Sequence, residues 1–88
     1  MFFIRVQTDS DYKYIREDRW ETPVRTNVQS DAKLFETASD AVEYARKFML
    51  VSTHHVHEVL DLQDNVHSTL HFTPRPNSKW ELDVKKVK

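Results

Sequence analysis

Histidines in the second half of the chain are the residues whose type and spacing best suit a metal ion. His55 and His57 are two residues apart, so on a strand their side chains point to the same face, about 7 Å apart. In the hairpin predicted below, His71 falls directly opposite His57. Neutral imidazoles grouped in this way can hold Zn²⁺, Ni²⁺ or Cu²⁺. The candidate metal site is therefore His55, His57 and His71, although solvated histidines on an ordinary sheet surface explain the pattern without any cofactor.

Two sequence patterns resemble motifs of metal-dependent enzymes but do not indicate catalysis. Residues 57–61 begin like the H-E-x-x-H motif of metalloproteases, which needs two histidines one turn apart on a helix face. Here the fifth residue is Asp61 and the segment has the pattern of a strand, so the two ends lie about 13 Å apart. Glu81, Asp83 and Lys85 alternate like the acid-x-Lys end of metal-dependent nucleases, but this is also the normal outer side of a sheet. We therefore expect no enzymatic activity.

Aromatic residues and arginines gather in the first quarter of the chain. Tyr12, Tyr14, Arg16 and Trp20 are residue types that anchor protein interfaces, and they define a candidate interaction surface. The same aromatic and basic residues could stack on the bases of single-stranded nucleic acid. Acidic residues within 17–21 weaken the positive field there, and a nucleic-acid footprint should be a coherent basic patch. A protein partner is therefore favoured over nucleic acid.

The composition excludes most familiar catalytic motifs. The chain has 88 residues with no cysteine and no glycine, and its net charge is −1. Without cysteine there is no disulfide, zinc ribbon or thiol nucleophile. Without glycine there is no phosphate-binding loop, dinucleotide fingerprint or nucleophile elbow. Left-handed turn positions are expected at Asn or Asp, which tolerate them best after glycine.

Targeting signals are not evident in the sequence. The apolar start at residues 1–4 is followed at once by Arg5, which leaves it too short for the core of a signal peptide. No apolar run approaches the roughly 20 residues of a membrane helix. We expect a cytoplasmic protein with no membrane partner.

A single convincing helix occupies residues 34–49. Thr37 is a good N-cap, and Asp40 stands where the acid of a capping box would be. The helix is expected to end near Leu50, because that residue would fall on the polar side. One apolar stripe at helical spacing predicts a buried face, formed by Ala38, Ala41, Val42, Ala45, Phe48 and Met49.

The rest of the chain is patterned as strands. Residues 2–7 alternate with a period of two, and residues 12–16 form a second strand in which either the tyrosines or Ile15 could face inward. Residues 17–33 are harder to assign, with a short edge strand at 24–28 or a functional loop as the expectations. A final strand begins at Trp80.

The two segments 54–62 and 66–73 form a predicted hairpin. A three-residue loop, Gln63 to Asn65, places Asn65 in the left-handed conformation. This register puts most apolar residues on one face and leaves His55, His57 and Val59 on the face away from the core. It pairs Leu62 with Val66, Leu60 with Ser68, Glu58 with Leu70 and Val56 with Phe72.

These elements predict a single α+β domain over residues 1–88. One amphipathic helix packs on an antiparallel sheet of about five strands, in the order β-β-(β)-α-β-β-β. The expected function is a small accessory or regulatory protein that acts as a non-catalytic interaction module. Its partner would be another protein or its own copy, since free edge strands can pair between chains into a homodimer. The alternatives are a nucleic-acid-binding protein and a histidine-rich metal-binding protein.

Overall fold

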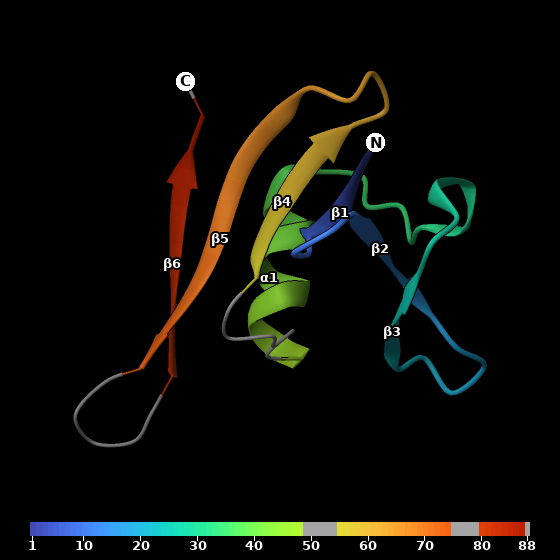
Figure 1. Cartoon of the computed structure of the whole chain (residues 1–88), viewed down its shortest axis with the longest axis horizontal. Coiled ribbons are helices and arrows are strands. Elements are labelled where there is room, and N and C mark those ends of the chain that lie inside the picture. Colours follow the sequence, from blue (N-terminus) through green and yellow to red (C-terminus); the bar gives the residue numbers. More distant parts are fainter. Residues whose placement is uncertain (49–54, 75–79, 88) are drawn as a thin grey trace.

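Two three-stranded meanders form one sheet with a helix on one side (Figure 1). The computed structural model describes residues 1–48, 55–74 and 80–87. The sheet is antiparallel in the order β3-β2-β1-β4-β5-β6, so β1 and β4 join the meanders at its centre. The predicted α+β fold is confirmed, and the optional third strand is present. The elements are β1 (Phe2–Gln7), β2 (Tyr12–Glu17), β3 (Pro23–Thr26), α1 (Ala38–Phe48), β4 (Val56–Asp61), β5 (Val66–Pro74) and β6 (Trp80–Lys86).

Helix α1 begins at Ala38, directly after the predicted N-cap Thr37, so residues 34–37 of the predicted range precede it. The Asp40 amide donates to the Thr37 hydroxyl at 3.0 Å, which satisfies one of the free donors of the first turn. Ala41 and Ala45 are fully buried, and their small side chains let the helix lie close to β1, β4 and β5. The described helix ends at Phe48, and Met49 and Leu50 lie outside the described residues. None of the described helices is long and apolar enough to cross a membrane.

The main core lies between α1 and the face of the sheet that it covers. Ile4 and Val6 from β1 pack there with Ile15 of β2, Val59 of β4 and Leu70 of β5. The inward position of Ile15 resolves the phase of β2 and directs Tyr12 and Tyr14 to the opposite face. That opposite face, called the open face below, carries no described helix.

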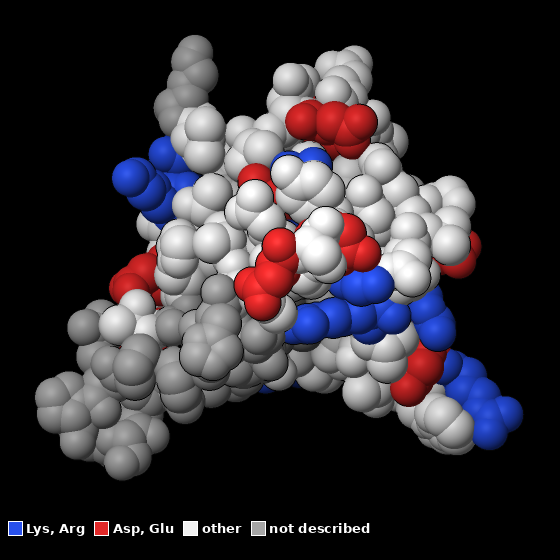
Figure 2. All heavy atoms as spheres, in the orientation of Figure 1, with Lys and Arg blue, Asp and Glu red and all other residues white. Residues whose placement is uncertain are grey.

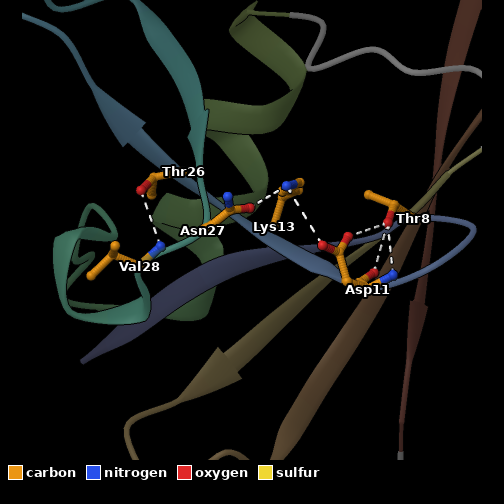
Figure 3. A network of polar contacts seen from close by, with 6 residues as sticks. All are labelled: Thr8, Asp11, Lys13, Thr26, Asn27 and Val28. Carbon is orange, nitrogen blue, oxygen red and sulfur yellow. Dashed lines mark hydrogen bonds and ion pairs between the residues drawn. The ribbon is translucent and has the colours of Figure 1, made fainter.

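The β1–β2 turn is held by side chains in place of glycine (Figure 3). The Thr8 hydroxyl donates to the Asp11 carboxylate at 2.6 Å and accepts from the Asp11 amide at 3.0 Å. These bonds and the nearby Lys13 lower the pKa of Asp11. Lys13 lies 3.6 Å from Asp11 and also donates to Asn27, so the turn is connected to the end of β3.

Left-handed backbone positions occur at Asp64 and Glu21, with φ angles of 64° and 59°. Asp64 fits the expectation for a chain without glycine, whereas Glu21 is an exception. The prediction that Asn65 adopts the left-handed conformation was wrong, because Asp64 adopts it instead. The Asp61 carboxylate sets this loop by accepting from the amides of Gln63 at 2.8 Å and Asn65 at 3.0 Å.

The predicted register of the β4–β5 hairpin was also wrong. Leu70 lies opposite His57 instead of Glu58, and the pairing shifts between Val59 and Leu60. Since Leu60 faces Val66 while Val59 faces Ser68, His67 is the extra residue of a bulge. A bulge moves every later residue of the strand by one position, which a regular two-residue alternation cannot reveal.

The two faces of β4 are exchanged relative to the prediction. His57 and Val59 are on the helix-covered face, because they pair with Val6 and Ile4 of β1. Leu60 is fully buried as well, on the open face beside Phe3. A central strand that is buried on both faces carries apolar residues at consecutive positions, so its alternation does not identify the inner face.

Candidate interaction surface

Tyr12, Tyr14 and Arg16 occupy successive open-face positions along β2. Tyr14 pairs with Arg5 of β1 and with Thr26 of β3, so it lies in the middle of its meander. The Tyr14 ring contacts Phe3 with centroids 6.0 Å apart, and the Tyr12 side chain is 43% exposed. The structure therefore brings three of the four predicted interface residues onto one strand face.

Arg5 holds the Tyr12 ring in place. Its guanidinium carbon lies 4.0 Å from the Tyr12 centroid, and its Nε and a terminal nitrogen each lie 3.0 Å from Glu58 Oε1. The Arg5 and Glu58 side chains are only 18% and 13% exposed, so this ion pair is shielded better than a surface pair. An aromatic ring fixed in this way loses little conformational entropy when a partner covers it.

Trp20, the fourth residue, lies in the turn between β2 and β3. The Asp18 carboxylate accepts from the amides of Trp20 at 2.9 Å and Thr22 at 3.0 Å, which holds the turn closed. The indole is 69% exposed, and the Arg19 guanidinium lies 4.2 Å from its ring. An exposed indole partly covered by a cation is a contact surface that a partner can use.

Glu17 belongs to a network that sequence reasoning missed. It accepts from the Tyr44 hydroxyl and pairs with Lys33, both at 3.0 Å. The pKa of Tyr44 is raised mainly by burial of its hydroxyl and, to a smaller extent, by the Glu17 carboxylate. Glu17 thus ties the end of β2 to α1, and Lys33 compensates its negative charge. No local pattern signals this contact, because Glu17 and Tyr44 are 27 residues apart.

The three predicted metal ligands are not brought together. His57 is 1% exposed on the helix-covered face, whereas His71 is exposed on the open face opposite Asp83. His55 lies just before β4, with Nε2 4.0 Å from Asp9. The register that placed His71 opposite His57 is the error behind this prediction. Within the described residues no group of three His, Cys, Asp or Glu side chains could hold a metal ion.

Burial also changes the chemistry of His57. Loss of water lowers its pKa to about 4, although the bond of its ring to the His55 carbonyl acts in the opposite direction. A neutral imidazole therefore sits in the core between Val6 and Leu70. It is a core histidine in place of the surface histidine that the sequence predicts.

A groove between α1 and β6, which the sequence did not indicate, holds about 320 Å³. Ala38 and Val42 line it from the helix, and Val84 lines it from β6. It lies beside the outermost strand, where the helix no longer covers the sheet. No local sequence pattern signals it, because its walls come from α1, β5 and β6, which are far apart in the sequence.

Charges of both signs are interspersed over the face drawn in Figure 2. Several basic side chains lie next to one another across the centre and right of this view, and acidic side chains border them. No protein-family model, curated protein or solved structure matches the chain. The geometry of the described residues is therefore what bears on the function of this chain.

Proposed function

We propose that this chain is a small, non-catalytic accessory protein of the cytosol that acts by binding another protein. The proposed contact surface is formed by Tyr12, Tyr14 and Arg16 on β2, together with Trp20 in the next turn. The observation that carries the proposal is the aromatic open face of β2, where Arg5 packs on the exposed Tyr12 ring. Fixed, partly exposed Tyr and Trp rings beside arginines are typical interface anchors.

Single-stranded nucleic acid is the less favoured ligand for the same residues. Arg5 is already paired with Glu58, and the net charge of the chain is −1. A phosphate backbone would need free cations in a continuous groove. Protein binding needs no such field, since its anchors are mostly apolar rings.

Affinity capture with the full chain as bait tests this proposal. Proteins that the wild-type bait retains should not be retained when the bait is the Trp20→Ala or the Tyr12→Ala variant. Truncating an interface anchor costs about 2 kcal/mol or more of binding free energy, close to thirtyfold in affinity. Arg46→Ala, an exposed change on α1, is the matched control and should retain them. Retention that is equal for all four baits would contradict the proposed surface.

A gel-shift experiment at low salt separates the nucleic-acid alternative. We expect no shift with single-stranded DNA or RNA. A shift that Tyr12→Ala abolishes, and that weakens steeply as salt is added, would replace protein binding by nucleic-acid binding.

A further inference from the structure

The outer edge of β6 is the longer of the two free edges of the sheet. β6 has seven residues, and no strand within residues 1–48, 55–74 and 80–87 pairs with its outer side. β3, at the other edge, has only four residues and begins with Pro23, which has no amide to donate. Figure 1 shows β6 at one side of the sheet, away from α1. Strand addition is therefore far easier at β6 than at β3.

The backbone groups of β6 alternate between its partner strand and the free edge. The Val87 amide donates to the His67 carbonyl at 3.0 Å, so these two residues form a hydrogen-bonded pair. The pairing with β5 continues without a shift, so residues 85, 83 and 81 also direct their amides and carbonyls toward β5. The amides and carbonyls of Leu82, Val84 and Lys86 consequently point outward.

The side chains of β6 separate into an apolar and a charged row. Leu82 and Val84 face the helix side, because Val84 pairs with Leu70 of the core. Val84 is 40% exposed and forms part of the groove beside α1. Glu81, Asp83 and Lys85 are on the open face, where Asp83 also accepts from the Thr73 hydroxyl at 2.5 Å.

We propose that β6 pairs with β6 of a second copy of this chain, antiparallel and centred on Val84. A two-fold axis perpendicular to the sheet then relates the copies, and the six-stranded sheets become one continuous sheet. Val84 faces Val84 of the second copy with both amides directed across the edge. On the open face, Asp83 of each chain lies opposite Lys85 of the other, in a pair without direct backbone bonds, where side chains approach most closely.

Charge selects this register over its neighbours. When the two-fold axis is perpendicular to the sheet, one residue of β6 lies opposite the same residue of the second copy. The possible registers therefore differ in which residue of β6 is at this centre. Centring on Asp83 sets two Asp83 carboxylates directly against each other. Centring on Leu82 sets Glu81 against Asp83 twice. The Asp83 centre also pairs Glu81 with Lys85 twice, but it keeps the Asp83–Asp83 contact between them. Among these three registers only the Val84 centre has two attractive pairs and no like-charged pair.

The same arrangement explains why the edge need not grow into a fibre. Self-pairing uses the β6 edge of both copies and leaves only the short β3 edges outward. A two-fold interface of this kind is closed, so the assembly stops at two chains. This prediction is independent of the Tyr12 and Trp20 surface, so either can fail without the other.

Light scattering on the full chain, read against the mass of 10.5 kDa for one chain, tests the pairing. The wild type should have twice this mass. Val84→Pro should have the mass of one chain, because it removes an amide that points outward while the β5 ladder keeps its donors. Far-UV circular dichroism should show that the variant keeps its sheet. A wild-type monomer at high concentration would overturn the proposal, and so would a folded Val84→Pro dimer.

Charge variants test the register. Asp83→Lys and Lys85→Asp should each weaken the dimer about tenfold or more, because each creates two like-charged pairs. The double variant D83K/K85D should restore it, and a mixture of the two single variants should form a mixed dimer. Glu81→Lys is the control, since Glu81 faces Val87 in this register, and its effect should be smaller. No recovery in the double variant, or a loss with Glu81→Lys as large as that with Asp83→Lys, would overturn the Val84-centred pairing.

Discussion

His57 is an ionisable side chain in a position that the core makes apolar. It lies on the helix-covered face beside Val6 and Leu70, and its pKa is about 4 because the protonated form would lose its water. The unfolded chain holds the same group near the ordinary 6.5. As the pH falls below 6.5, the unfolded chain therefore takes up the proton first. The free energy of unfolding should decrease from pH 6.5 toward pH 4, and this group has no such effect above pH 6.5.

A non-titrating variant isolates this effect. Relative to its value at pH 7.5, the free energy of unfolding of the wild type should be about 2 kcal/mol lower at pH 5 because of His57 alone. His57→Leu should lack this decrease. As the pH is lowered, the free energy of unfolding of the variant should therefore rise relative to that of the wild type. Urea denaturation at both pH values measures the shift. The same pH dependence in both proteins would show that His57 is accessible to water.

At the scale of the element, α1 combines a local signal with a tertiary one. The Thr37 hydroxyl caps the first turn, and the apolar stripe meets the sheet at Ala38, Ala41 and Ala45. The cap depends on residues next to each other in the chain. The burial of the alanines depends on β1, β4 and β5 being in place beneath the helix. A short helix is marginal alone, so packing supplies most of its stability.

Thr37→Ala should lower the free energy of unfolding by about 1 kcal/mol, because the Asp40 amide then loses its acceptor in the first turn. Thr37→Ser keeps an oxygen at the same place and should stay close to the wild type. Thermal melting of the three proteins gives the comparison, with a loss of about 4–8 °C expected for the alanine variant only. Equal melting of the alanine and serine variants would show that the cap contributes nothing.

At the scale of the whole molecule, two meanders share one sheet through the β1–β4 pairing. Core side chains from β1, β2, β4 and β5 belong to one cluster under α1. Among the residues that the structure describes, neither meander has a separate apolar cluster of this size, so the two meanders should unfold together. Cooperative unfolding of the two meanders is what the prediction of a single domain over residues 1–88 implies.

The two tryptophans test this cooperativity, because Trp20 follows β2 in the first meander and Trp80 begins β6 in the second. The variants Trp80→Phe and Trp20→Phe each keep one tryptophan. In each variant, thermal unfolding followed by the fluorescence of that tryptophan should have the same midpoint as unfolding followed by far-UV circular dichroism. Two midpoints within one variant would instead indicate that the meanders unfold separately.

Most features that depend on neighbouring residues were predicted correctly, although the left-handed position of the β4–β5 loop is at Asp64 instead of Asn65. The helix start at Thr37, the alternation of β1 and the placement of a strand before α1 all depend on contacts within a few residues. The grouping of Tyr12, Tyr14 and Arg16 on one face follows from the same two-residue period. Their role in binding stays a prediction, as do the absence of catalysis and the nucleic-acid alternative, whereas His55, His57 and His71 are not brought together as a metal site.

The faces and registers of the sheet depend on partners that are distant in sequence. β4 is buried on both sides, so its apolar residues do not mark the inner face, and only pairing with β1 turns His57 inward. The bulge at His67 then moves His71 away from it, because one extra residue reverses the direction of every later side chain. The position of β6 at the edge of the described strands is likewise a consequence of strand order. A single sequence encodes these features only through the summed energy of long-range contacts, which no local pattern displays.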